Sequence, residues 1–184
     1  MAAEPPRVIF GTSFDSLFSS DLRAHITPTL DAEFKKLGVN LSKPFQPAYA
    51  IEVWVAIIEL LCKHLYPKDS RETAQWKLGR STIEGFVHTL IGKAAFAFMR
   101  LVGPVRSVER AARTYANTNN YTKIDLKRIA PTAFEFTLNE KHTLPEYDMG
   151  ILEAVLEHVG AKQPHVTLLK RDAESFTLKL EWAA

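Results

Sequence analysis

The sequence predicts an α+β fold in which a helical N-terminal part precedes a four-stranded antiparallel sheet with one helix packed on it. Apolar residues recur at helical spacing to about residue 117, and beyond that point they alternate in two pairs of strand-like runs. One segment between the two pairs returns to helical spacing. We therefore expect a single domain over residues 1–184, with its helical part at about 9–117 and its sheet part at about 118–184.

The composition is that of an ordinary globular protein. Hydrophobic residues make up 46% of the chain and charged residues 24%, with a formal net charge of +2. The 23 basic residues are spread along the chain rather than clustered, which argues against a nucleic-acid partner. The single cysteine, Cys62, lies in the apolar run "AIIELLCKHLY", as is typical of a buried thiol in a reducing compartment.

The location expected from these features is the cytoplasm. The first ten residues, "MAAEPPRVIF", lack the basic start and apolar core of a secretory signal. The most apolar stretch, "GFVHTLIGKAAFAFMRLVG", is interrupted by His88, Lys93 and Arg100 and is too short for a membrane span. We expect it to form a buried helix.

Helical patterns fill the first half of the chain. Two short helices are expected over residues 13–37, with Pro28 starting the second and Gly38 following it. A proline-containing connector over residues 40–49 leads to the helix "AIEVWVAIIELLCKHLY", which Pro67 ends.

Residues 69–103 continue the helical spacing after a capping-box pattern, in which Asp69 or Ser70 precedes Glu72 and Thr73. We expect one break in this segment, near Gly79. Gly85 and Gly92 inside the helical pattern each cost about 1 kcal/mol relative to alanine, so a close neighbour is expected at each of them. Packing against another helix is favoured over a ligand at these glycines. The segment "GPVRSVERAARTYAN" then starts a further helix.

Two hairpins and one helix make up the rest. "TKIDLKRI" and "TAFEFTLNE" alternate as one hairpin, and "HVTLLKRDAESFTLKLEW" contains the other, with "RDAE" as its turn. Between them, "PEYDMGILEAVLEHVGAK" predicts a helix over residues 149–159, with Gly160 as its stop. Glu146 and Asp148 are interpreted as acidic residues favoured at the N-terminus of this helix.

The stretch "RTYANTNNYTKIDL" lies where helical spacing changes to alternation, and it has two interpretations. Asn117, Thr118, Asn119 and Asn120 are short polar residues that bond to nearby backbone at helix ends and turns, which makes the stretch a joint. The same groups could line a pocket. We expect the joint to be the main role.

The segment "GILEAVLEHVGAKQPHVTLLKRDAESFTLKLEW" resembles the ligand-binding fold shared by haem nitric-oxide sensors, four-vinyl-reductase domains and small subunits of the TRAPP tethering complex. The whole chain looks like a myxobacterial paralogous domain of about 180 residues and of unknown function, through "PAYAIEVWVAIIELL", "LGRSTIEGFVHTLIGKAAFAFMRLVGP" and "TNNYTKIDLKRIAPTAFEFTLNE". The resemblance implies a cavity between the helical part and the sheet, and pairing through helices as a homodimer or with a signalling protein.

The sequence contains few residues that could bind a cofactor or form an active site. His88 is the candidate haem ligand, but the Tyr-x-Ser-x-Arg signature that holds haem in the nitric-oxide sensors is absent after the helix. Cys62 and His64 would point away from each other on one helix, so they do not form a metal site. The sequence contains no nucleophile elbow and no phosphate loop. We expect no cofactor, no metal, no catalytic residue and no enzyme activity.

The function predicted from the sequence is that of a cytosolic signalling module, which acts as a sensor of a small apolar ligand or as an adaptor. A protein-protein interaction scaffold is the alternative, and a haem-based gas sensor is disfavoured. The predicted ligand-binding residues are Phe86, His88, Leu90, Phe98, Tyr115 and Asn119.

Overall fold

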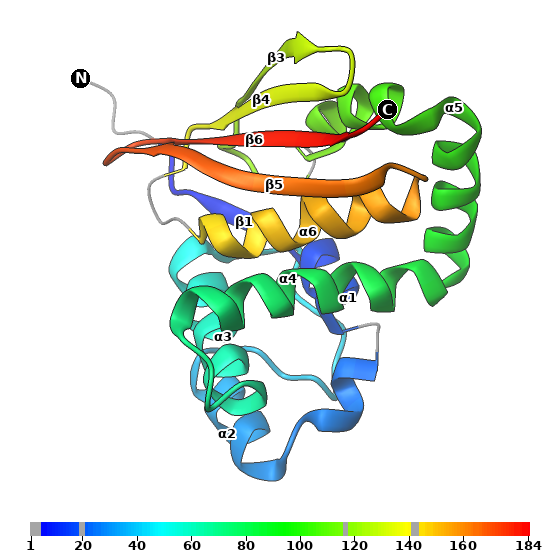
Figure 1. Cartoon of the computed structure of the whole chain (residues 1–184). Coiled ribbons are helices and arrows are strands. Elements are labelled where there is room, and N and C mark those ends of the chain that lie inside the picture. The colour runs from blue at the N-terminus through cyan, green and yellow to red at the C-terminus, as the bar shows by residue number, and fades with distance from the viewer. Residues whose placement is uncertain (1–4, 19–20, 116–117, 141–143) are drawn as a thin grey trace.

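A four-stranded sheet and a set of helices form the two main layers of the protein (Figure 1). The structure is a computed structural model that describes residues 5–18, 21–115, 118–140 and 144–184. The N-terminal elements are β1 (Val8–Phe10), α1 (Gly11–Phe18), the 3-10 helix η1 (Asp21–His25), α2 (Pro28–Lys36), β2 (Ala48–Ala50), α3 (Ile51–Leu65), α4 (Arg71–His88) and α5 (Leu90–Tyr115). The C-terminal elements are β3 (Ile124–Ala130), β4 (Ala133–Leu138), α6 (Pro145–His158), β5 (Lys162–Arg171) and β6 (Phe176–Ala183).

The main sheet has the strand order β3-β4-β6-β5, and all its neighbours are antiparallel. Phe136 of β4 lies opposite Leu178 of β6, which in turn lies opposite Leu168 of β5. Phe136 and Leu178 are fully buried, because the alternation places every second residue of β4 and β6 on the face that α6 covers. The predicted α+β fold with two hairpins around one helix is confirmed.

A second sheet of two short strands was not predicted. β1 pairs with β2, with Ile9 opposite Tyr49, and strands of three residues are too short to give an alternating pattern in the sequence. β1 is also joined to the distant stretch before β3, since the backbone amide of Phe10 donates to the carbonyl of Thr118 (2.9 Å).

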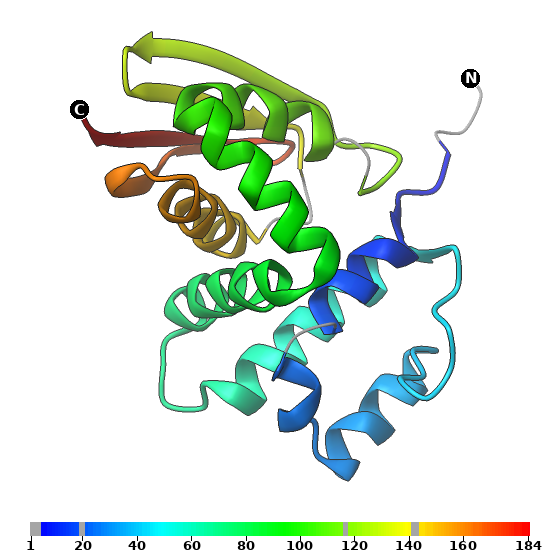
Figure 2. The same ribbon diagram turned by 90° about the vertical axis from the view of Figure 1, so that its right-hand side faces the viewer.

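The predicted break near Gly79 is wrong, because α4 continues through Gly79 and ends at His88. The chain instead turns at Thr89, and the axes of α4 and α5 are bent by 97° (Figure 2). The hydroxyl of Thr89 accepts a hydrogen bond from the backbone amide of Gly92 (2.9 Å), as a helix-capping residue does. A further kink within α5 falls at Gly103, where φ is +79° before Pro104.

Gly79 allows α4 and α6 to cross at a short distance. A Cβ atom at Gly79 would overlap the carbonyl oxygen of Tyr147, and one at Gly150 would overlap the carbonyl oxygen of Trp76. The two helix backbones can approach this closely only because both positions are glycine. The crossing fixes α6 against the helical layer, so that Tyr147 joins the N-terminal core and Leu152 joins the core under the sheet.

Within the described part of the chain, no individual helix has both the length and the apolar character needed to cross a membrane. The segments 71–88 and 90–111 meet these criteria only when they are taken together, and they are the two helices that the 97° bend separates.

Candidate functional site

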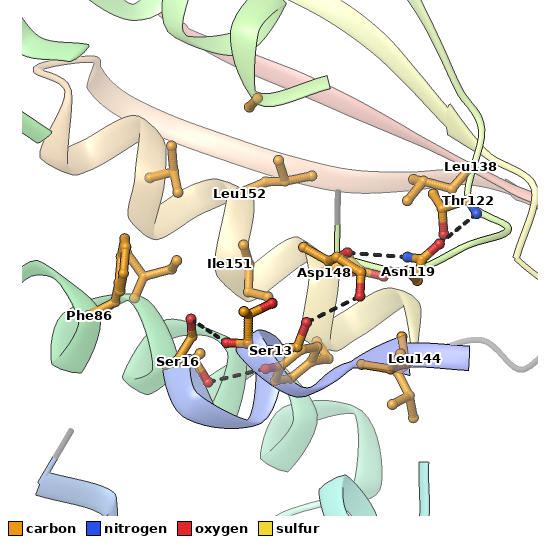
Figure 3. Close-up of a pocket in the computed structure, with 18 of the residues that line it drawn as sticks. Ser13, Ser16, Phe86, Asn119, Thr122, Leu138, Leu144, Asp148, Ile151 and Leu152 are labelled. Carbon is orange, nitrogen blue, oxygen red and sulfur yellow. Dashed lines mark hydrogen bonds between the residues drawn. The ribbon is translucent and has the colours of Figure 1, made fainter. Parts of the chain in front are cut away.

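A cavity of about 610 Å³ lies between the helical layer and α6. Its walls come from α1, α3, α4, α5, α6 and the stretch that leads into β3 (Figure 3). Most of the lining side chains are aliphatic or aromatic. They include Ile51, Trp54, Val55, Ile83, Phe86, Ile91, Phe96, Phe98, Met99, Leu138, Leu144, Ile151, Leu152 and Val155. A volume of this size and this lining are typical of a pocket for a small organic molecule.

One carboxyl group stands out in this apolar lining. Asp148 lies in the first turn of α6 and is 8% exposed. Burial raises the pKa of its carboxyl group from 3.8 to about 8, because transfer out of water disfavours the charged form. Ser13, Thr118 and Asn119 also line the cavity, and they are bonded together, because the Ser13 hydroxyl donates to the carbonyl of Thr118 (3.3 Å) and Asn119 Nδ2 donates to the Thr118 hydroxyl (3.2 Å) (Figure 3). Three segments that are far apart in the sequence therefore form one polar end of the cavity.

Asn119 reaches this position through a turn that its own side chain holds. Its Oδ1 accepts hydrogen bonds from the backbone amides of Tyr121 (3.1 Å) and Thr122 (2.7 Å). Asn120 binds the N-terminal segment, because its Oδ1 accepts from the amide of Val8 and its Nδ2 donates to the carbonyl of Pro6 (both 2.9 Å). The predicted joint is confirmed for these residues, whereas Asn117 lies outside the described residues.

Several other polar groups of the lining contact neighbouring residues of the same cavity. The hydroxyl groups of Thr82 and Tyr147 lie 3.2 Å apart at hydrogen-bond distance, and burial raises the pKa of the Tyr147 phenol. The guanidinium of Arg110 lies 4.8 Å from the ring centroid of Phe98, in a cation–π contact. Burial, and next the nearby Glu140, raise the pKa of Tyr121.

The structure brings three of the six predicted ligand-binding residues to this cavity, namely Phe86, Phe98 and Asn119. His88 lies at a separate cavity of about 370 Å³ instead, which it lines together with Leu22, His25, Leu65, Tyr66, Ser81, Glu84 and Gly85. Leu90 is 86% exposed. His88 follows Phe86 by two residues on α4 and therefore faces away from the large cavity, whereas Leu90 faces solvent although the next residue, Ile91, lines the cavity. The side chain of Tyr115 lies outside the described residues.

The prominent residue that the sequence analysis missed is Asp148. It was interpreted as a favourable charge at a helix N-terminus, but it lies on the same helix face as the cavity-lining residues Ile151, Leu152 and Val155. The spacing of these four residues, i, i+3, i+4 and i+7, is the signal that could have identified it. A carboxyl group on an otherwise apolar helix face indicates a buried charge.

The arrangement of helices and sheet around this cavity is the fold of H-NOX domains. The F78L variant of the H-NOX domain designated Tt superposes with a TM-score of 0.72, with 13% identity over 96% of both chains. An oxygen-binding H-NOX domain related to soluble guanylate cyclases has a TM-score of 0.69, with 14% identity over 95% of this chain and 93% of that one. The Fe(II) unliganded H-NOX protein from K. algicida has a TM-score of 0.65, with 10% identity over 96% and 97%.

At the level of sequence, the chain belongs to the family described as "Protein of unknown function (DUF2378)", whose model matches residues 7–183. No curated protein sequence matches this chain. The expected resemblance to the haem nitric-oxide sensor fold and to a family of unknown function is thus confirmed. Since the identities to the solved structures are below 15%, these likenesses establish the fold alone.

A haem group needs an axial ligand, and the residues described around the large cavity do not supply a suitable one. None of its described lining residues is a histidine or a cysteine. Burial raises the pKa of both lining tyrosines, Tyr121 and Tyr147, which disfavours the phenolate that would bind iron. The donor set that the described residues give this cavity therefore does not fit a haem group.

Proposed function

We propose that this protein is a non-catalytic cytosolic signalling module that binds a small, largely apolar ligand in the cavity between the helical layer and α6. The observation that supports this proposal best is the cavity of about 610 Å³ with apolar walls and one polar end. The apolar walls would take up the body of the ligand, and the polar end around Asp148 would set its orientation.

The fold of this protein serves ligand binding elsewhere. One of the H-NOX domains that share it is described as oxygen binding. The cavity here differs in its chemistry from a haem site, since its described lining provides no histidine or cysteine. We therefore infer an organic ligand rather than a haem-bound gas.

Helix α5 is the element through which occupancy of the cavity would reach a partner. Ile91 and Phe98 line the cavity, yet they are 74% and 45% exposed. A ligand that packs against the inner side of these residues would favour one position of α5 over another. The size of this shift is set by the difference between the ligand's affinities for the two positions of the helix. The outer side of the same helix presents that change to a binding partner.

Native mass spectrometry of the protein purified from its own host, together with its absorption spectrum, tests this function. The expected result is an added organic mass of one molecule per chain and no absorption band near 400 nm. A strong band at that wavelength would instead indicate haem, and it would contradict the proposal. Protein that carries no added mass and takes up no apolar probe would also contradict it.

Self-association is a second candidate function, and the outer face of α5 favours it. Leu90 and Leu101 are both 86% exposed, and they lie on one helix face with Ile91 and Phe98. Exposed apolar residues gathered in this way mark interaction surfaces. The partner that we propose is a second copy of the chain, because a stripe on one helix can pair with itself about a twofold axis.

Light scattering of the wild-type protein and of Leu101→Lys tests the self-association. We expect a dimer at tens of micromolar for the wild type and a monomer of unchanged stability for the variant, since Leu101 makes little contact with its own chain. A wild-type monomer at this concentration would contradict the proposed homodimer, and a dimer that persists in the variant would exclude this face as its interface.

A further inference from the structure

We propose that the ligand of the large cavity is a neutral apolar molecule with one hydroxyl group, and that Asn119 and Ser13 bind this hydroxyl. The inference rests on the proposed function, because it requires that the cavity bind an apolar ligand at all. It adds the chemical class of that ligand and the two residues that select it.

The side-chain amide of Asn119 supplies the hydrogen-bond donor of this site. Asn119 lines the cavity and is 5% exposed. Its Oδ1 accepts from the backbone amides of Tyr121 and Thr122, which fixes the orientation of the amide group, and its Nδ2 donates to the hydroxyl of Thr118 (3.2 Å). The Nδ2 atom carries two hydrogens, so one of them is without an acceptor among the residues that the structure describes. A buried donor without an acceptor is unfavourable, and an oxygen of the ligand can accept from it.

The hydroxyl of Ser13 supplies the acceptor. Ser13 lies on α1, lines the cavity and donates its one hydroxyl hydrogen to the backbone carbonyl of Thr118 (3.3 Å). The lone pairs of its oxygen are therefore what it offers to a ligand. Since Ser13 and Asn119 both bond to Thr118, the acceptor and the donor lie at the same end of the cavity (Figure 3).

One donor and one acceptor at the same end of the cavity match a hydroxyl group, because a hydroxyl both accepts and donates. An ether, a ketone or an ester can accept from Asn119 but has no hydrogen to donate to Ser13. A hydrocarbon would leave both groups unpaired. The rest of the molecule would lie against the apolar face of α6, which Ile151, Leu152 and Val155 form.

The polar end of the cavity also favours a neutral group over an ion. Ser13, Thr118 and Asn119 are uncharged. Burial raises the pKa of Asp148 to about 8, so its carboxyl is largely protonated at pH 6.5. An ammonium or a carboxylate on the ligand would have to leave water without an opposite charge from these four residues, and such a transfer is costly.

Two probes with the same number of non-hydrogen atoms test the match, namely 1-decanol and methyl nonyl ether. Their affinities can be measured at pH 6.5 by displacement of the neutral dye Nile red from the wild-type protein and from two variants, Ser13→Ala and Ser16→Ala. We expect 1-decanol to bind the wild type about fivefold or more tightly than the ether, because it makes one more hydrogen bond. A cavity without such partners would prefer the ether instead, since burial of an unpaired hydroxyl is costly.

The two variants separate Ser13 from a second hydroxyl on the same helix. Ser16 also lines the cavity, and its hydroxyl donates to the carbonyl of Thr12 (3.0 Å) within α1. We expect Ser13→Ala to bring the affinities for the two probes within about twofold of each other, and Ser16→Ala to retain the preference for 1-decanol. Ser13→Ala is expected to fold, because the carbonyl of Thr118 also accepts from the backbone amide of Phe10 (2.9 Å).

Nuclear magnetic resonance of the wild-type protein tests the role of Asn119 without a substitution at that position. A hydrogen bond from Nδ2 to the oxygen of 1-decanol should shift the resonance of one side-chain amide hydrogen of Asn119 downfield. Methyl nonyl ether should cause a similar shift, because its oxygen can accept the same bond. Unchanged Asn119 resonances at saturating 1-decanol would overturn the assignment to this residue.

The outcomes separate this inference from the proposed function. If the ether binds the wild type as tightly as 1-decanol, or if decylamine or decanoate binds more tightly than 1-decanol, the inference is overturned while the apolar-ligand function stands. If Ser16→Ala removes the preference for 1-decanol and Ser13→Ala retains it, the assignment to Ser13 is overturned. If neither Nile red nor any of these probes binds the wild type, both proposals fail.

Discussion

Replacement of Asp148 by asparagine tests whether the cavity wall holds a carboxyl group that is protonated in the folded protein. Asparagine has nearly the same shape and no charge, so the variant keeps the packing and removes the titration. In the unfolded chain the carboxyl titrates near its ordinary pKa of 3.8, and in the folded protein burial raises this pKa to about 8. The folded state therefore binds one more proton than the unfolded state between these two pH values.

The sign and the size of the effect on stability follow from this difference. Since the folded state binds the extra proton, the free energy of unfolding falls as the pH rises from about 4 to about 8. One pKa unit corresponds to about 1.4 kcal/mol, so a rise from pH 5.5 to pH 7.5 costs the wild type about 2–3 kcal/mol through this group. The variant has no such contribution from position 148.

The assay is urea unfolding of both proteins at pH 5.5, 6.5 and 7.5. The difference in the free energy of unfolding between wild type and variant isolates position 148, because other titrating groups contribute equally to both proteins. We expect this difference to shift in favour of the variant by about 2–3 kcal/mol across the series. Parallel pH profiles of the two proteins would refute the reasoning that the carboxyl is buried and largely neutral below pH 7.

Four further substitutions test the architecture around the cavity. Gly150→Ala and Gly79→Ala should each destabilise the protein by about 1–3 kcal/mol, because the added methyl group would overlap a carbonyl oxygen of the facing helix, and thermal unfolding measures the loss. A variant as stable as the wild type would show that the helices can separate there without cost. Asn119→Ala should cost about 1–3 kcal/mol, since it leaves the buried amide of Thr122 without its acceptor, and Asn120→Ala should cost less because its bonds are exposed. The opposite order in urea unfolding would contradict the role assigned to Asn119.

Much of the fold could be predicted because its signals are local. The helix before Gly160 and the two hairpins each have an unbroken period of apolar residues and a turn sequence at their ends. The two-stranded sheet could not be predicted in this way, since each of its strands has only three residues. Val8 of β1 lies opposite Ala50 of β2, and neither segment has a residue pattern that indicates pairing with a strand so far away in the sequence.

The position of the break between α4 and α5 was predicted wrongly because a glycine was taken as the end of a helix. Gly79 was interpreted as a helix breaker, yet it permits the close approach of α6, which the sequence of α4 alone does not reveal. The true turn is at Thr89, whose hydroxyl accepts from the amide of Gly92. A threonine three residues before a glycine is a weak signal, because the same pair occurs in loops of many kinds.

The candidate site could be predicted only in part for a related reason. Phe86, Phe98 and Asn119 were identified from their residue types and from the cavity that the resemblance implied. Asp148 was missed because the cavity that it lines is formed also by α1 and by the turn at Asn119, which lie far from it in the sequence. Burial of a charge depends on such tertiary contacts, and a sequence shows only which face of its own helix the residue occupies.

The account depends most directly on the cavity as a ligand site, and titration of Nile red into the wild-type protein and into Val155→Trp tests this claim. Val155 lines the cavity, so a tryptophan at this position would fill part of it, whereas Leu169→Trp on the exposed side of β5 is the matched control. The account predicts saturable binding of one dye per chain to the wild type and the control, with an affinity at least tenfold lower for Val155→Trp. Equal binding to all three proteins would contradict it.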